Sequence, residues 1–311
     1  MSAAFGLTGE MLVLLMIALI GFIMRKANIL PKESNQVLTQ IILYITLPCL
    51  IIYSMDISFS MELFVDISWL LGLSIFALLG TTVIGYLMRK RAKLPANREG
   101  VYEAAIIFGN QGFMGYAIAY LLFGEVGVLY TAFFMIFFLF YVWTYVIYVV
   151  ARVGQKISWR QLFLNPGVIA TSLGFIVMVL PFSLPSLIGS VLVDIGTMTL
   201  PLSMILIGSL LAAISALEFK QLMKNQYIWY ATVAKLVLLP MLLVPFLWLP
   251  VSTTVMGVAI LVTATPSAPT VPMFAQKYGG DVSFSSVIVA TTTILCVITI
   301  PMLYAFILFI R

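Results

Sequence analysis

Ten long apolar runs, separated by short loops, constrain the fold of this chain more than any other feature. The runs fall at residues 6–24, 36–55, 66–88, 100–122, 127–151, 163–181, 187–212, 227–248, 254–276 and 285–310. One transmembrane helix needs about 20 apolar residues, so each run is long enough to cross a bilayer. Only 9% of the residues are charged, against roughly a quarter in soluble domains. The sequence therefore predicts an all-α membrane protein with ten transmembrane helices.

The loops between the runs alternate in charge along the chain. The odd-numbered loops and their flanks carry the positive residues Arg25, Lys26, Lys32, Arg89, Lys90, Arg91, Lys93, Arg98, Arg152, Lys156, Arg160, Lys220, Lys224 and Lys277. The even-numbered loops contain no lysine or arginine. Because positive loops stay in the cytoplasm, we expect the odd loops inside and both termini outside. The pattern predicts a multi-pass membrane protein with lipid as its main contact.

The composition also argues against several kinds of site. No stripe of basic and aromatic residues accompanies the net charge of +5, so we expect no nucleic-acid partner. The chain has no histidine, which removes histidine metal sites and every Ser-His or Cys-His catalytic pair. Cys49 and Cys296 both lie inside apolar runs, where a disulfide framework or metal site is not expected. We therefore expect no bound metal and no cofactor.

Short motifs recur at a constant spacing and indicate an internal repeat. Gly21-Phe22-Ile23 reappears as Gly174-Phe175-Ile176, and Thr46-Leu47-Pro48 reappears as Thr199-Leu200-Pro201. The offset equals five apolar runs, so the second copy must enter the membrane in the opposite direction. Inverted repeats of this kind are common in secondary transporters. Chance similarity between two Leu-rich halves is the competing explanation.

The repeat divides the chain into two expected five-helix halves, residues 1–155 and 156–311. Pro48 and Pro201 occupy matching places in the second and seventh apolar runs. Proline commonly kinks a helix, which is one interpretation of both residues. The other is that they form hinges or walls of a substrate cavity.

Two apolar runs are interrupted near their centres, at equivalent places in the two halves. The fourth run contains Gly109-Asn110-Gln111-Gly112-Phe113-Met114-Gly115, and the ninth contains Thr265-Pro266-Ser267-Ala268-Pro269-Thr270-Val271-Pro272. Paired broken helices at corresponding positions are the best sequence indication of a transporter's binding site. Alternatively, the glycines and prolines only kink two packed helices, since both residues are frequent in membrane spans.

The interruptions supply the groups that an anion site needs. Each break frees backbone N–H groups at the start of a half-helix, where the helix dipole also favours negative charge. The substrate-binding residues predicted here are Asn110, Gln111, Gly112, Thr265, Pro266, Ser267, Pro269 and Thr270. The predicted breaks and hinges add Gly109, Gly115 and Pro272, because glycine lets backbones approach and proline removes an N–H.

Two ionisable residues inside apolar runs are further candidates. Lys235, in the eighth run, either faces an anionic substrate or snorkels toward the membrane interface. Glu103, at the start of the fourth run, either couples transport to protons or pairs with Arg89 or Arg98. No pair of midplane carboxylates is visible, so a sodium site would rest on carbonyls and hydroxyls of the broken helices. Both a proton and a sodium ion therefore remain candidates for the coupling ion.

The motifs resemble the auxin efflux carrier family in its bacterial branch, over essentially the whole chain. The resemblance implies a location in a bacterial cytoplasmic (inner) membrane. The similar elements are Asn110-Gln111-Gly112-Phe113-Met114-Gly115, Tyr120-Leu121-Leu122-Phe123-Gly124, Ala264-Thr265-Pro266-Ser267-Ala268 and Gln276-Lys277-Tyr278-Gly279-Gly280-Asp281. Family members often carry proline where this chain has Ala117, so the first break rests on its glycines.

The resemblance implies the fold shared by bile-acid sodium symporters and sodium/proton antiporters. Helices 1, 2, 6 and 7 would form a scaffold, and helices 3–5 and 8–10 a moving transport unit. Helices 4 and 9 would cross at the substrate site. The resemblance also implies organic-anion substrates such as auxin, malate or malonate, and it is compatible with a homodimer through the scaffold.

Together these features predict a secondary active transporter that moves a small malate- or malonate-like anion by alternating access. An intramembrane enzyme is one alternative, but it would need a catalytic set at depth, for which Lys235 and scattered serines are the candidates. A channel or a membrane sensor is another, although the loops leave no room for an output domain. We expect a transporter rather than an enzyme.

Overall fold

The computed structural model of the protein describes residues 2–31, 33–56, 60–141, 144–145, 147–151, 166–180, 183–213 and 215–310. Lys32 and the positive residues of the fifth loop, Arg152, Lys156 and Arg160, lie outside the described residues. The expected boundary between the two halves, at 155/156, lies outside them as well.

The described chain is built from helices, several of which contain irregular turns. The first half contains α1 (Ser2–Lys26), α2 (Ser34–Ile41), the π-helical turn η1 (Ile42–Thr46), α3 (Leu47–Ser54), α4 (Met61–Arg91), α5 (Ala96–Ile107), the π-helical turn η2 (Gln111–Gly115), α6 (Tyr116–Tyr141) and α7 (Ile147–Ala151). The second half contains α9 (Pro166–Val179), α10 (Ser186–Thr197), α11 (Thr199–Ala212), α12 (Ala216–Leu222), α13 (Gln226–Val233), the π-helical turn η4 (Ala234–Leu238), α14 (Leu239–Met241), the 3₁₀ helix η5 (Val244–Trp248), α15 (Thr253–Thr263), α16 (Thr270–Tyr278) and α17 (Val282–Ile310).

Six helical stretches of the described chain are long and apolar enough to cross a membrane. They are Ser34–Ser54, Met61–Arg91, Tyr116–Phe138, Ser186–Ala212, Gln226–Trp248 and Val282–Ile310. The fourth and ninth predicted spans are not among them because each is divided, which leaves α5 with 12 residues, α15 with 11 and α16 with 9. The protein is therefore a multi-pass membrane protein, whereas the count of ten spans and the inverted repeat stay predictions.

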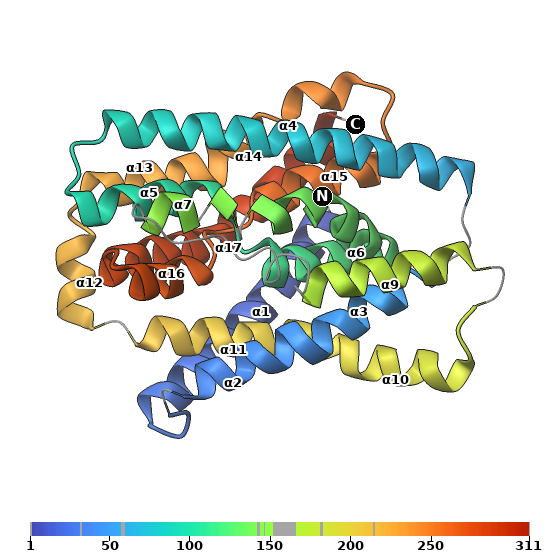
Figure 1. Ribbon diagram of the computed structural model, residues 1–311, viewed down its shortest axis with the longest axis horizontal. Helices are drawn as coiled ribbons and strands as arrows, with labels where there is room; N and C mark the ends of the chain where they lie inside the picture. Colours follow the sequence, from blue (N-terminus) through green and yellow to red (C-terminus); the bar gives the residue numbers. More distant parts are fainter. Residues whose placement is uncertain are drawn as a thin grey trace.

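The helices pack in two groups. In Figure 1, α4 runs along one edge of the molecule, and α2, α3, α10 and α11 lie along the opposite edge. In the first group α4 packs against α5 and α6, and α15 packs against α6. In the second group α1 packs against α11, and α3 packs against α9 and α10. α17 packs against α5, α13 and α16 on the side of the first group. The groups meet where α1 contacts α17, where α3 and α9 contact α6, and where α11 contacts η2. Their roles as transport unit and scaffold stay predictions.

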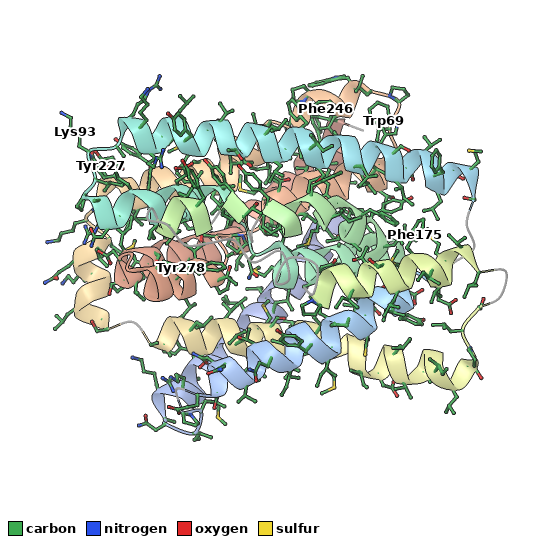
Figure 2. All side chains as sticks on the ribbon, in the orientation of Figure 1. Trp69, Lys93, Phe175, Tyr227, Phe246 and Tyr278 are labelled. Carbon is green, nitrogen blue, oxygen red and sulfur yellow. The ribbon has the colours of Figure 1, made fainter. Side chains whose placement is uncertain are left out.

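The long axis of the molecule has the dimensions of a bilayer crossing. The 31 residues of α4 make a helix of about 46 Å, longer than the roughly 30 Å hydrocarbon core of a bilayer. In Figure 2, Lys93 and Tyr227 lie at one end of this axis, and Trp69 and Phe175 lie toward the other. Phe246 lies nearer the middle, where its ring contacts Phe76 of α4. The backbone N–H of Lys93 donates to the Tyr227 hydroxyl at 3.0 Å. Tyrosine and tryptophan at both ends fit the two membrane interfaces, where these residues are enriched.

The closest helix packing in the second group lies between α1 and α11, and it depends on two glycines. A Cβ atom on Gly208 would overlap the carbonyl oxygen of Ala18, and one on Gly21 would overlap that of Ile205. Small residues at such contacts let membrane helices approach closely, which increases van der Waals contact between them. The glycines therefore hold the pair α1–α11 together by their lack of a side chain.

We expect Gly208→Ala to destabilise the protein by about 1–3 kcal/mol, the usual cost of overpacking a close contact. The midpoint of thermal unfolding in detergent measures the effect. Gly189→Ala on α10 is the matched control, because a Cβ atom there has open space within 4 Å. An equal loss of stability in both variants would contradict the role of Gly208 in close packing.

Candidate functional site

The two interrupted helices meet at their breaks. Gly109 and Ser267 form a short antiparallel bridge between the segments. The backbone N–H of Asn110 donates to the carbonyl of Pro266 at 2.6 Å, and that of Ala268 donates to the carbonyl of Phe108 at 2.9 Å. Backbone groups released by each break are therefore partly satisfied by the other break. Irregular backbone at membrane depth is tolerated where protein replaces the lost helical bonds in this way.

The first break separates α5 from η2. Phe108, which follows α5, is extended, with φ −91° and ψ 110°. The chain turns helical again at Gln111, and the carbonyl of Asn110 accepts bonds from the N–H groups of Met114 and Gly115 at 2.9 and 3.1 Å. The wider π turn ends at Gly115. The N-terminus of η2 therefore starts at the crossing, and Asn110 stands directly before it.

The second break separates α15 from α16. Pro269 is the residue that precedes α16, and Thr270 is its first residue. Pro272 lies in the first turn of α16 rather than in the break itself. The first-turn N–H groups of a helix have no partner within the helix, so proline at this place costs no hydrogen bond.

The side chains of Asn110 and Gln111 are buried at the crossing with unused hydrogen-bonding capacity. Both Oδ1 and Nδ2 of Asn110, and Oε1 of Gln111, have no hydrogen-bond partner in the part of the chain that the structure describes. Burying an amide without partners costs about 1–3 kcal/mol in proteins. Buried polar groups left in this condition are typical of sites that bind a ligand.

Lys235 reaches the same place from η4 and does not snorkel to the interface. Its side chain is 0% exposed, and its Nζ has no hydrogen-bond partner among the described residues. A Cβ atom built on Gly109 would lie 2.8 Å from this Nζ and 2.6 Å from the Thr265 Oγ1. The ammonium group therefore lies against the backbone of the first break. No serine is within hydrogen-bond reach of it in the described chain, so the Ser–Lys pair of an intramembrane enzyme is not formed there.

The hydroxyl groups of the second break are mostly used within the protein. The Ser267 Oγ donates to the carbonyl of Ala105 at 2.7 Å, and the Thr265 Oγ1 donates to the carbonyl of Val262 at 2.8 Å. The backbone N–H of Ser267 donates to the Thr292 Oγ1 at 3.1 Å. Ser267 thus ties the end of α5 to the second break, while Thr270 is half-buried at the start of α16.

A small cavity of about 20 Å³ lies beside the crossing. It is lined by Ser74, Ala77, Leu78, Thr81, Ile107, Gln111, Phe134, Phe138, Lys235 and Thr263. A space of this size holds one water molecule, whereas pockets that enclose small organic ligands usually measure several hundred Å³. This cavity is therefore too small, as it stands, to hold an organic molecule.

The cavity contains polar residues that sequence reasoning missed. Ser74 and Thr81 come from α4, and Thr263 is the last residue of α15. Ser74 and Thr81 are seven residues apart, two helical turns, and so share one face of α4. This spacing of hydroxyls within an apolar helix is a signal that could have identified them.

Glu103 is held in an ion pair away from the crossing. Its Oε2 lies 2.9 Å from Nε of Arg89, and its Oε1 accepts a 2.6 Å hydrogen bond from the Tyr145 hydroxyl. Arg98 pairs instead with Asp281 at 2.7 Å. Of the two predicted partners, Arg89 is the one that Glu103 meets. Its role in proton coupling stays a prediction.

Pro48 and Pro201 both lie at the starts of helices. Pro48 is in the first turn of α3 directly after η1, and Pro201 is in the first turn of α11. The preceding Thr46 and Thr199 are buried, and neither hydroxyl has a partner among the residues described. The hinge role of the two prolines stays a prediction.

Comparisons with known proteins agree with this architecture. The profile of the membrane transport protein family matches residues 7–158 and 150–304. An uncharacterized transporter of Methanocaldococcus jannaschii is 28% identical over 118 residues, an alignment that covers 38% of this chain and 38% of the relative. The family match covers nearly the whole chain and confirms the resemblance of its motifs. The chain therefore belongs to the membrane transport protein family, which is that of the auxin efflux carriers, and it is a transporter rather than an enzyme.

Proposed function

We propose that the protein is a secondary active transporter that carries a small organic anion, malate- or malonate-like, by alternating access. The substrate would bind where the two broken helices cross. Asn110, Gln111 and Lys235 would contact its carboxylate groups. Gly112 and the residues of the second break, Thr265, Pro266, Ser267, Pro269 and Thr270, would form the surrounding wall.

One observation carries this proposal: unsatisfied polar groups from two separate helices converge on the crossing. Nζ of Lys235 and Nδ2 of Asn110 are donors, both buried and without partners in the described chain. The N-terminus of η2 begins beside Asn110 and adds the positive end of a helix dipole. These groups together favour a negatively charged ligand. A carboxylate also accepts several hydrogen bonds at once, which matches the number of unused donors.

The size of the cavity supports alternating access rather than a permanent pore. A cavity of about 20 Å³ gives no continuous path for an organic anion. Substrate binding therefore requires relative movement of the helices around the crossing. The two groups of helices described above are the natural moving parts, since they meet at η2 and α11.

The test is exchange across reconstituted membranes. We expect proteoliposomes loaded with malonate or malate to accelerate uptake of the same labelled anion from outside, because a carrier returns faster when loaded. Protein-free liposomes provide the background. Absence of saturable exchange with a broad panel of organic anions would reject the carrier proposal. Flux without acceleration by internal substrate would instead indicate a channel.

We also propose the location and orientation given by the loop charges. The protein would lie in a bacterial cytoplasmic membrane with its basic loops in the cytoplasm and both termini outside. The basic C-terminal end of α4, Arg89–Arg91, and Lys93 lie toward the Tyr227 end of the molecule, which would be the cytoplasmic end (Figure 2). Impermeant labelling of single cysteines placed in the first and second loops of intact cells would test this orientation. A homodimer through the α1–α3 and α9–α11 group is the expected assembly.

A further inference from the structure

The side chain of Lys235 is a buried basic group for which the described structure supplies no counter-charge. The ammonium group is fully buried and has no hydrogen-bond partner in the described structure. An isolated charge in a dry interior is strongly unfavourable unless an opposite charge or several dipoles surround it. Burial therefore disfavours the charged form of Lys235, and a negative partner beside it would favour that form.

Acidic side chains near the helices around Lys235 already have other partners. Glu103 is paired with Arg89 and accepts a bond from Tyr145. Asp281 is paired with Arg98 and also accepts from the N–H of Phe284 at the start of α17. Asp66, on α4, accepts hydrogen bonds from the hydroxyls of Tyr130 and Ser252. Among the residues described, no carboxylate forms an ion pair with Lys235.

The elements packed against η4 carry other ionisable side chains. These elements are α5, α13, α14 and α17, and α4 joins them at the small cavity. Several of these side chains have contacts elsewhere: Tyr102 with Tyr227 and Phe284, Tyr227 also with Tyr230 and the N–H of Lys93, Cys296 with the carbonyl of Thr293, Tyr304 with Phe123, Arg89 with Glu103 and Tyr86, and Arg98 with Asp281. Glu99 lies in the first turn of α5, Glu62 in the first turn of α4, and Lys90 and Arg91 in the last turn of α4. No ionisable side chain other than Lys235 lines the described wall of the cavity.

We propose that Lys235 carries the coupling proton of this transporter. The amine takes up a proton when a substrate carboxylate binds beside it, and the ammonium–carboxylate pair crosses as a unit. On the other side the carboxylate leaves, the proton leaves to water, and the neutral amine returns with the empty site. Each transported anion is then accompanied by one proton bound to Lys235. This inference rests on the proposed function, whose substrate supplies the negative charge.

The physical basis is linkage between two ligands at one site. Protonation of Lys235 strengthens carboxylate binding, and by reciprocity a bound carboxylate strengthens proton binding. A buried pair of opposite charges is tolerated far better than either charge alone. The empty carrier and the carrier loaded with both anion and proton are therefore the two forms that would reorient. With a dianion such as malonate, the ammonium group would pair with one carboxylate, and Asn110 Nδ2 and the N-terminus of η2 would face the other. Because neither ligand would cross alone, the proton and the anion would be transported together in the same direction.

Proton uptake on substrate binding tests the inference directly. The full-length protein in weakly buffered detergent is mixed with malonate at the same neutral pH, and a pH-sensitive dye records proton uptake. We expect about one proton per bound malonate. Lys235→Met should lose both binding and uptake. Lys224→Met, at an exposed site, is the matched control and should behave like the parent protein.

Lys235→Arg separates charge from proton exchange. An arginine guanidinium stays protonated, so this variant should bind malonate without taking up a proton. Malonate binding with no proton uptake by the unmodified protein would overturn the inference and leave the carrier proposal intact. Uptake that persists in Lys235→Met but disappears in Glu103→Gln would overturn it in favour of Glu103. If no anion binds or is exchanged, the proposed carrier function is wrong. The exchange assay tests that function independently of the proton-uptake assay, which tests the role of Lys235. Proton uptake by the unmodified protein on malonate binding tests the inference even if a variant does not fold.

Discussion

Replacing Asn110 with alanine is expected to stop anion exchange without weakening the fold. Both polar atoms of the Asn110 side chain are buried and have no partner in the described chain, so the substitution breaks no internal hydrogen bond. Removing an unpaired buried amide offsets the small volume lost, and we expect unchanged or slightly raised thermal stability. A hydrogen bond to a charged ligand contributes about 1.5–3 kcal/mol, so exchange at low substrate should fall about 10- to 100-fold. Exchange in proteoliposomes and unfolding in detergent measure the two effects.

Asn225 serves as the control, because its side chain, unlike that of Asn110, makes a hydrogen bond within the protein. Its side chain accepts a 3.0 Å hydrogen bond from the N–H of Tyr227 and caps α13. Asn225→Ala should cost about 0.5–2 kcal/mol of stability through loss of the cap and leave exchange by the folded protein unchanged. If Asn110→Ala behaved like Asn225→Ala, losing stability but keeping transport, the Asn110 side chain would be structural and outside the site. A stabilised but inactive variant is the pattern expected when function requires an unsatisfied group.

The sequence predicted the features that depend on local chemistry. Apolar length and loop charge predicted a multi-pass helical membrane protein, which the family match and the apolar helices support. The two interruptions were visible because glycine and proline act on their own backbone, wherever the rest of the chain lies. The structure places a helix end at Ile107 and another at Thr263, within two residues of the motifs.

Contacts between residues far apart in the chain could not be predicted from the sequence. Nothing in the order of residues says that the N–H of Asn110 bonds to the carbonyl of Pro266, because the two are joined only by packing. The same holds for Ser267, whose hydroxyl donates a hydrogen bond to the carbonyl of Ala105. Lys235 could be given two interpretations from its depth alone. Its full burial against Gly109 excludes snorkelling, and that contact depends on the tertiary crossing. Its contact with a substrate stays a prediction.

A methyl group at position 109 is expected to disable the site while leaving the fold intact. A Cβ atom there would lie 2.6 Å from the Thr265 Oγ1 and 2.8 Å from the Lys235 Nζ. The Lys235 Nζ is the end of a flexible side chain and can move aside, whereas the Thr265 Oγ1, which donates to the carbonyl of Val262, must shift by rotation about its Cα–Cβ bond. The helices need not separate. Because binding groups must be held within about 0.5 Å of their working positions, we expect Gly109→Ala to reduce anion exchange about tenfold or more, equivalent to about 1.4 kcal/mol of binding. Gly72→Ala on α4, where a Cβ atom has open space, should leave exchange unchanged.

A double-mutant cycle identifies what the methyl group displaces. If Gly109→Ala acts by pushing the ammonium group of Lys235, its effect on thermal stability should be smaller in a Lys235→Ala background, where that side chain is gone. Residues in contact usually show interaction energies of about 0.5–3 kcal/mol in such cycles, whereas independent sites add. Strict additivity would mean that the methyl group acts on Thr265 or on the backbone bridge instead. A clear coupling between positions 109 and 235 would place the Lys235 side chain at the crossing of the two breaks in the protein in solution, where the proposed anionic substrate would meet it.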